Sequence, residues 1–421
     1  MTLLAIFVTL LFLYSLVSAR LERSVVTAPI LFTVVGGCVA AGVPQFQTAR
    51  GDLEWVRRIA EAGLVLLLFT DASRTDLNIL NHVRKLPVRL LTVGMLLTIL
   101  LGGVAAFLLF PQMSIWEAGV LAAILAPTDA GLGQVVVNSP RVPMCVRQAL
   151  NVEAGLNDGL SVPFLLFFID LAVKRSSGSH AALLTLVGQQ LGLGALVGGG
   201  LGLLGGWLLG LAARTKTMAS SFQQLAVVTL PLLCVIGSEA LHASMFIAAF
   251  VAGLAVQVGF KEAGKHSLEF AEGWGQMFNL SVFFLFGLML ASSWMKFSAL
   301  QLLYALLSLT VVRMLPVAIS LAGTGLSKAT VLFMGWFGPR GLASIVLGLV
   351  YLGADIHAPD ESLIGLVVMV TVAVSIFAHG LTALPGMNLY ARSVAGLSPD
   401  SPERQELTPA QQPVVELHQA H

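Results

Sequence analysis

Apolar windows of about 20 residues recur along this chain of 421 residues, and they restrict its fold more than any other feature. A helix needs about 20 apolar residues to cross the hydrocarbon core of a bilayer. In lipid, backbone N–H and C=O groups need partners within the protein, so such segments span as helices. The sequence therefore predicts an all-α polytopic membrane protein with about thirteen transmembrane helices. The windows are 2–18, 24–42, 57–72, 88–110, 114–137, 146–173, 181–212, 222–240, 242–258, 270–292, 297–321, 328–354 and 362–386.

The composition agrees with a membrane protein. Hydrophobic residues make up 57% of the chain and charged residues 11%, whereas a soluble chain has about 25% charged residues. A net charge of +1 gives no reason to expect a nucleic-acid partner. The three cysteines have no CxxC spacing, which favours small buried hydrophobes over a metal or disulfide site. The motifs of hydrolases and nucleotide-binding enzymes are absent from suitable contexts, so we expect neither enzymatic activity nor a cofactor.

The two ends of the chain and the basic residues predict how the protein is oriented. Arg20 and Arg23 follow the first apolar run rather than precede it, which favours an uncleaved first helix over a signal peptide. With the N-terminus outside, fifteen of the 23 Lys and Arg residues fall on the inner side and six on the outer. The positive-inside rule then places the C-terminus in the cytoplasm. We expect residues 1–387 to form the transmembrane domain and residues 388–421, rich in Pro and Gln, a disordered cytoplasmic tail.

One predicted span is interrupted at an ionisable residue. The segment "LAPTDAGLG" places Pro127 just before Thr128 and Asp129, and glycines follow. Proline removes a backbone donor, and a helix broken inside the bilayer presents its ends to an ion. Pro127 alone would fit a simple kink equally well. Together with Asp129, it favours an ion site.

The next span, "NVEAGLNDG", carries three more polar side chains. Glu153 and Asn157 share one helix face, whereas Asp158 lies about 140° round from Glu153. Of the two arginines within spans, we expect Arg340 to pair with Glu153 and take Arg313 as the second candidate. Such a pair fixes two helices in register more than it adds stability.

Asp129 and Asp158 are left without an obvious basic partner. Two carboxylates in a low-dielectric site repel each other, so a monovalent cation and protons compete for the same oxygens. Thr128 and Asn157 add neutral oxygens that suit a hard cation.

Five segments together resemble the monovalent cation:proton antiporter-1 family, which includes the NhaP and NHE proteins. They are "LFTDASRTDL" (68–77), "PTDAGLG" (127–133), "EAGLNDG" (153–159), "FIAAFVAGL" (246–254) and "GPRGLAS" (338–344), in family order. The resemblance implies two inverted six-helix repeats with discontinuous helices crossing near the midplane, and a homodimer. It implies that Asp129, Asp158, Thr128 and Asn157 bind the cation or protons, with Na⁺ at the two aspartates. It also implies the Glu153–Arg340 pair and, through Asn157, electroneutral exchange.

Other polar positions are less informative. The family usually has a serine where this chain has Ala154, so the choice of cation stays open. Asp71 and Asp76 could line a cytoplasmic funnel or lie on a solvated helix end. We expect structural roles for Glu239, His242 and His379, although His379 could also sense pH. Ser375 and Thr371 are expected to pack within the last span.

The sequence thus predicts an inner-membrane antiporter that exchanges Na⁺, or Li⁺, for H⁺ by alternating access. A K⁺/H⁺ antiporter, a channel or a sensor with the same fold are the alternatives. The expected partners are the cation, protons, membrane lipid and a second copy of the chain.

Overall fold

A computed structural model describes residues 2–21, 24–42, 53–74, 85–137, 139–173, 180–260, 264–353, 360–398 and 400–404. The secondary structure of these residues is helical, without strands, as the sequence predicts. Eight of the helices are long and apolar enough to cross a bilayer, and four apolar helices of 10–17 residues accompany them in the described ranges. The exact number of spans stays a prediction, and so does the division into inverted repeats.

The first half of the chain contains the first interrupted span. Its elements are α1 (Thr2–Leu21), α2 (Ala28–Gly42), α4 (Leu53–Arg74), α6 (Lys85–Arg89), the π-helical turn η1 (Leu90–Gly94), α7 (Met95–Leu109), α8 (Ile115–Ile124), α9 (Ala130–Val137) and α10 (Met144–Val173). The predicted span 114–137 is therefore two short helices, α8 and α9, separated at Pro127.

The second half contains the second interrupted span. Its elements are α11 (His180–Arg214), α12 (Ser220–Leu241), α13 (Met245–Val256), α14 (Gly264–Ser293), η2 (Trp294–Lys296), α15 (Ala299–Leu309), α16 (Val311–Ser320), α17 (Lys328–Trp336), α18 (Leu342–Leu352) and α19 (Glu361–Ala395). The segment around Pro339 separates α17 from α18, as the glycines and proline of "GPRG" predict.

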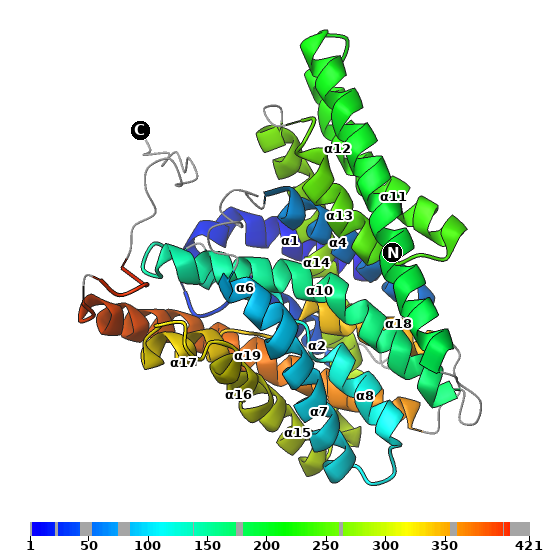
Figure 1. Ribbon diagram of the computed structural model, residues 1–421. Coiled ribbons are helices and arrows are strands. Elements are labelled where there is room, and N and C mark those ends of the chain that lie inside the picture. The colour runs from blue at the N-terminus through cyan, green and yellow to red at the C-terminus, as the bar shows by residue number, and fades with distance from the viewer. Residues whose placement is uncertain are drawn as a thin grey trace.

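The helices form two groups, and α10 runs between them (Figure 1). Helices α11, α12 and α13 contact one another, and α13 also contacts α4, which packs on α14. On the other side α7 and α8 pack together, α15 packs on α19, and α16 packs on α17. Because α10 touches α8, α9, α4, α13 and α18, its side chains meet both groups.

Small residues allow α11 to lie against α13 at close range. Gly198, Gly202 and Gly206 recur every fourth residue and so share one face of α11. A methyl group at any of them would overlap backbone atoms of Ala248, Ala252 or Val256. In lipid, where apolar surface gains nothing by leaving the solvent, such close packing holds helices together.

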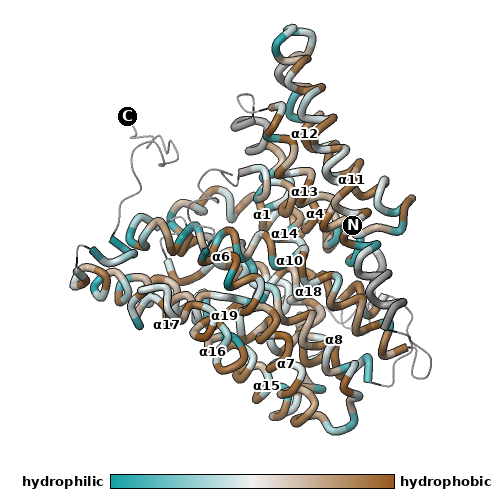
Figure 2. The backbone as a smooth tube through the Cα atoms, in the orientation of Figure 1, coloured by the Kyte–Doolittle hydropathy of each residue, from teal (hydrophilic) through white to brown (hydrophobic). Residues whose placement is uncertain are grey.

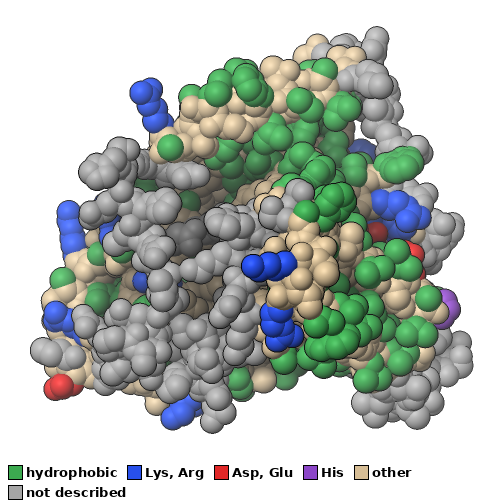
Figure 3. Space-filling model, turned by 90° about the horizontal axis from the view of Figure 1, so that it is seen from above, with side chains coloured by type: hydrophobic (Ala, Val, Ile, Leu, Met, Phe, Trp, Pro, Cys, Tyr) green, Lys and Arg blue, Asp and Glu red, His purple; other side chains and the backbone are tan. Residues whose placement is uncertain are grey.

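The outer surface is apolar, as contact with lipid requires. Large hydrophobic side chains are widely exposed, among them Phe12, Leu108, Leu196 and Leu389. The hydropathy colouring is brown along most helices (Figure 2). From above, hydrophobic side chains cover wide stretches of the described surface with few Lys or Arg between them (Figure 3). A soluble monomer rarely exposes such large apolar patches, so this surface fits a bilayer.

The last helix extends beyond the boundary expected at residue 387. Helix α19 continues to Ala395, and turns follow it to residue 404 apart from residue 399, which lies outside the described residues. Glu403 is buried and accepts hydrogen bonds from Ser327 N and Thr330 Oγ1, both at 2.7 Å. The assignment of a transmembrane domain and a tail stays a prediction, and residues 405–421 lie outside the described part.

Candidate cation and proton site

The first interruption leaves the C-terminal end of α8 and the N-terminal end of α9 inside the protein. Helix α8 begins with a capping box between Ser114 and Glu117. It ends at Ile124, and Pro127 has no N–H with which to continue it. Residues 125–129 are not helical, and α9 begins at Ala130. The last carbonyls of α8 and the first N–H groups of α9 therefore need partners from elsewhere.

Asp129 provides partners for two helix N-termini at once. Its Oδ1 accepts hydrogen bonds from Gly131 N at 2.7 Å and Leu132 N at 3.3 Å, in the first turn of α9. Its Oδ2 accepts one from Leu342 N at 2.7 Å, the first residue of α18. A carboxylate at a helix N-terminus is stabilised by both the hydrogen bonds and the helix dipole. The charge of Asp129 is thus held by the backbone of both interrupted spans.

Gly341 allows this close approach. A Cβ atom at position 341 would overlap the carboxylate of Asp129. The backbone also connects the two interruptions directly, because Asp129 N donates to Pro339 O at 2.8 Å. Packing against Asp129 therefore explains the glycine that follows Arg340 in "GPRG".

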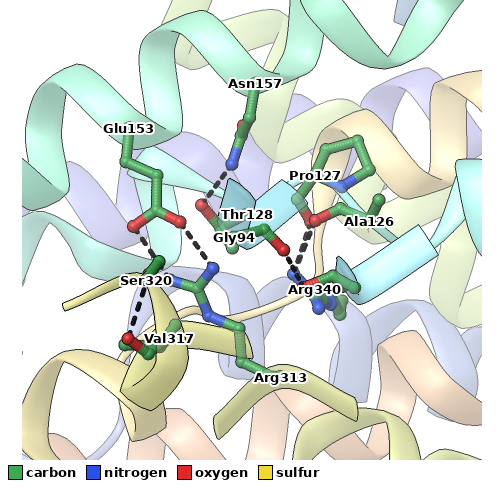
Figure 4. A network of polar contacts seen from close by, with 11 residues as sticks. Gly94, Ala126, Pro127, Thr128, Glu153, Asn157, Arg313, Val317, Ser320 and Arg340 are labelled. Atoms are coloured by element: carbon green, nitrogen blue, oxygen red, sulfur yellow. Dashed lines mark hydrogen bonds and ion pairs between the residues drawn. The ribbon is translucent and has the colours of Figure 1, made fainter. Parts of the chain in front are cut away.

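Arg340, in the second interruption, binds the backbone of the first one. Its Nη1 donates to Ala126 O at 2.9 Å and to Pro127 O at 3.0 Å, as Figure 4 shows. These carbonyls belong to the non-helical link after α8, two and three residues beyond its last residue, Ile124. The side chain is fully buried. Each interrupted span thus supplies a charged side chain that binds backbone groups at the interruption of the other.

The expected Glu153–Arg340 pair is wrong. Glu153 binds Arg313 of α16 instead, with Nη1 on Oε1 and Nη2 on Oε2 at 2.9 Å, a bidentate arrangement seen in Figure 4. Arg340 binds carbonyl oxygens through Nη1, whereas Arg313 passes across Gly338, where a Cβ would overlap its guanidinium. Helical phase identifies the face on which Glu153 lies but not which neighbour packs there.

Thr128 and Asn157 lie together between α8 and α10. Asn157 Nδ2 donates to Thr128 Oγ1 at 2.7 Å (Figure 4). Oδ1 of Asn157 is buried and accepts no hydrogen bond from a described residue. Oδ1 of Asp158, one residue further along α10, is in the same situation. Buried acceptors need a partner, so α10 presents two oxygens that can take a cation or, at Asp158, a proton.

Comparison with known proteins identifies the family. The profile of the family described as "Sodium/hydrogen exchanger, transmembrane" matches residues 6–388. The chain belongs to this family. It is 26% identical over 389 residues to the K⁺/H⁺ antiporter NhaP of Alkalimonas amylolytica, covering 89% of this chain and 64% of that protein. It is 27% identical over 302 residues to the K⁺/H⁺ antiporter NhaP2 of Shewanella sp. strain MR-4, covering 69% and 50% of the two chains.

Further relatives support the same conclusion. A Na⁺/H⁺ antiporter of Schizosaccharomyces pombe is 26% identical over 274 residues, which are 61% of this chain and 58% of that one. The chain therefore spans between half and two thirds of the length of these three curated relatives. Among solved structures, the sodium proton antiporter MjNhaP1 of Methanocaldococcus jannaschii superposes with a TM-score of 0.73 at 20% identity, covering 94% of this chain and 99% of its own. At that identity the likeness shows the fold, and it confirms the all-helical exchanger architecture.

A small cavity adds Asp71 to the polar residues beside α10. The cavity of about 30 Å³ is lined by Asp71 of α4, by Asn151 and Gly155 of α10, and by Phe250 and Leu254 of α13, among others. A Cβ at Gly155 would lie 3.8 Å from the Cβ of Asp71, so the two helices are close at this point. Gly155 is three residues before Asp158 and lies on the same side of α10. Asp76, the other expected funnel residue, lies outside the described residues.

Three residues without an expected transport role lie elsewhere in this exchanger fold. Glu239 and His242 are exposed where α12 ends, and His242 closes that helix in a left-handed conformation with φ 52°. His379 is buried on α19 against the second interruption. The contacts of His379 could not be predicted from the sequence, because every residue has a backbone carbonyl and the sequence does not show which one lies near the ring.

Proposed function

We propose that this chain exchanges a monovalent cation for a proton across the membrane, with Asp158 as the carboxylate that both ions share. The observation that carries the proposal is the contrast between the two aspartates. Asp129 accepts three backbone hydrogen bonds, whereas Asp158 Oδ1 is buried and accepts none from a described residue. A buried carboxylate oxygen without a donor binds either a proton or a cation in order to be stable.

The buried charges around the crossing favour exchange of one cation for one proton. In the described part of the chain the buried acids here are Asp129, Glu153 and Asp158, and the buried bases are Arg313 and Arg340. With one proton or one monovalent cation bound, this group is neutral. Without either ion it carries one net negative charge in a low-dielectric interior, which is costly. The loaded states can therefore change conformation more easily than the empty state, and the exchange is electroneutral.

Thr128, Asn157 and Asp129 complete the proposed binding site. Asn157 Oδ1 offers a neutral ligand, and the bond from its amide to Thr128 holds it next to Asp158. Asp129 contributes a fixed negative charge and its remaining lone pairs. Oxygen ligands of this kind suit hard monovalent cations.

The cation is proposed to be Na⁺, with Li⁺ as a possible substitute. K⁺ is the second candidate because two of the relatives are named K⁺/H⁺ antiporters. Ala154 is buried beside Glu153 and has no hydroxyl. Helix α10 therefore offers one oxygen ligand fewer than it would with a serine at this position. Asp71 and the cavity beside Gly155 form an access path for the ion, in which Asp71 attracts cations toward α10.

The setting in the cell is part of the proposal. The N-terminus lies outside and the C-terminus in the cytoplasm of an inner membrane, because fifteen of the 23 basic residues then fall inside. Two copies form a homodimer, and one part of each copy moves against the other to alternate access. Membrane lipid covers the exposed apolar side chains described above.

Transport into vesicles tests the proposal. Reconstituted wild-type protein is expected to move protons when Na⁺, Li⁺ or K⁺ is added, and an imposed membrane potential is expected to leave the rate unchanged. The Asp158→Asn variant should show no exchange, whereas Asp170→Asn, an acid further along α10, should keep the wild-type rate. Cation currents without proton movement would identify a channel. The absence of both cation and proton movement would favour a sensor. Exchange retained in Asp158→Asn would contradict the assignment of the site.

A further inference from the structure

A row of polar side chains on α19 faces the second interruption. Ser375, His379 and Thr382 are spaced by four and three residues, so they lie on one face of the helix. Ser375 and His379 are buried. All three contact the stretch from Trp336 to Arg340, where α17 ends and the chain turns into α18.

The end of α17 is held at two atoms of one residue. His379 Nε2 lies 2.8 Å from Trp336 O, and Trp336 Nε1 donates to Thr382 Oγ1 at 2.9 Å. The indole and imidazole rings also pack together, with centroids 5.0 Å apart and planes at 33°. Trp336 is the last residue of α17, and its carbonyl has no donor within the helix but accepts from Gly338 N at 2.8 Å, so His379 is its second partner.

The other end of the turn is held by Ser375. Its hydroxyl accepts a hydrogen bond from Arg340 N at 2.6 Å. The same hydroxyl lies 3.1 Å from His379 Nδ1. Nδ1 also lies 2.9 Å from the carbonyl oxygen of Ser375. With the ring proton on Nε2, His379 donates to Trp336 O and Nδ1 accepts from the Ser375 hydroxyl, whereas with the ring proton on Nδ1, His379 donates to Ser375 O. The tautomer with its proton on Nε2 completes a chain of hydrogen bonds from Arg340 N through Ser375 and His379 to Trp336.

This chain determines where the crossing atoms lie. The segment that it fixes, 336–340, contains Pro339, whose carbonyl accepts from Asp129 N, and Arg340, whose guanidinium binds two carbonyls in the link between α8 and α9. A shift of that segment would move Asp129 and the neighbouring Thr128, which holds Asn157. Hydrogen-bond partners one step removed from an ion site commonly tune its affinity in this way.

We propose that His379, together with Ser375, is a positioning residue for the cation site, acting through the backbone of 336–340. It never contacts the ion. The inference rests on the proposed exchange function, and it deepens that function by assigning part of the cation affinity to α19.

Three variants separate positioning from simple packing. His379→Met fills a similar volume without either ring nitrogen, whereas His379→Gln keeps a donor near the position of Nε2. Thr371→Val is the matched control, because Thr371 is also buried on α19 and its hydroxyl donates to Val367 O of the same helix. The readouts are the half-saturating cation concentration and the maximal rate in proteoliposomes containing equal amounts of folded protein.

The positioning role predicts a specific pattern. His379→Met should raise the half-saturating cation concentration about 10- to 100-fold, the usual effect of losing such an outer partner. His379→Gln should stay within about threefold of wild type, well under the tenfold change that corresponds to 1.4 kcal/mol. Thr371→Val should match wild type. If His379→Met does not fold, Ser375→Ala takes its place, with an expected increase of about tenfold.

The outcomes distinguish this inference from the function on which it rests. Absence of exchange in the wild type with every cation would overturn the proposed function. Exchange in the wild type with unchanged half-saturation in His379→Met, or in Ser375→Ala if the first variant is not folded, would overturn the positioning role alone. Equal losses in His379→Met and His379→Gln would also overturn it, because the bond to Trp336 O would then have no effect.

Discussion

The two interrupted spans are built alike but carry opposite charges. Where α8 stops before α9 the chain places Asp129, and where α17 stops before α18 it places Arg340. Asp129 accepts hydrogen bonds from N–H groups at the start of α9 and α18, and Arg340 donates to the carbonyls of Ala126 and Pro127 in the link after α8. Each interruption therefore depends on the other. Both charges are used to stabilise the crossing itself.

Helix α10 differs from both. It is continuous through Glu153, Asn157 and Asp158, so it has no free backbone groups there to hold a carboxylate. Glu153 is neutralised by Arg313, and the polar oxygens of Asn157 and Asp158 stay available. On the proposed function, a buried acid in this protein is structural where helix ends or an arginine bind it and exchangeable where neither does.

Removing Asp129 should have the largest effect on folding. Asp129→Ala leaves three N–H groups without their acceptor, two of them buried, at about 1–3 kcal/mol for each buried group. We expect little folded protein on size exclusion in detergent and no transport. Asp158→Asn, by contrast, should elute and melt like the wild type. If Asp129→Ala melts within a few degrees of wild type, the crossing does not depend on this carboxylate.

The pairing of Glu153 can be tested by a double-mutant cycle. Breaking a buried pair from one side costs about 3–5 kcal/mol, because the other charge stays buried. Glu153→Gln and Arg313→Met should therefore each lower the melting temperature strongly, and the double variant should recover much of the loss. The same cycle with Arg340→Met is the control and should show a much smaller coupling. A larger coupling to Arg340 than to Arg313 would contradict the geometry.

Removing the amide of Asn157 should have an intermediate effect. Asn157→Ala deletes the bond to Thr128 Oγ1, worth about 1 kcal/mol, and one candidate ligand oxygen. We expect a folded protein with a raised half-saturating cation concentration. Thr128→Val, which removes only the partner hydroxyl, should show a smaller increase. Wild-type affinity in Asn157→Ala would exclude this amide from the site.

Replacing Glu403 should have the smallest effect on stability. This residue offers a comparison with Asp129 outside the predicted spans. Like Asp129 it bonds the start of a helix, here α17, but it follows the last spanning helix. Burial raises the pKa of Glu403, but the bonds from Ser327 and Thr330 outweigh burial and hold the pKa below its ordinary value of 4.5. Its contribution to stability is therefore present above that value and is lost as the pH falls through the lower pKa of the folded state.

The Glu403→Gln variant tests that contribution. Near neutral pH it should lower the free energy of unfolding by about 1 kcal/mol, since a neutral amide replaces a charge-assisted acceptor. As the pH falls through the lowered pKa of Glu403, the wild type and the variant should converge in melting temperature. Arg392→Gln, at an exposed position near the end of α19, serves as a control and should leave the pH dependence unchanged. A constant difference at every pH would contradict a role for the charge.

The sequence predicts the local features well and the long-range contacts poorly. Proline and glycine at 127 and 338–341 predict both interruptions, because those residues lack a donor or a side chain. The motifs also place Thr128, Asp129, Asn157 and Asp158 on neighbouring elements, and the structure brings Thr128 and Asn157 into contact. The partner of Glu153 is missed, because helical phase cannot choose between two arginines. The roles of Arg340 and His379 depend on backbone carbonyls, which every residue has.

Proton release on cation binding tests the central claim most directly. Purified wild-type protein in weakly buffered detergent solution, at a pH where the site is protonated, should release about one proton for each cation bound, because both ions occupy the same carboxylate oxygen. The Asp158→Asn variant should release none, although its melting temperature matches the wild type. Undiminished proton release from a folded Asp158→Asn variant would contradict the account, because the exchangeable carboxylate would then lie elsewhere.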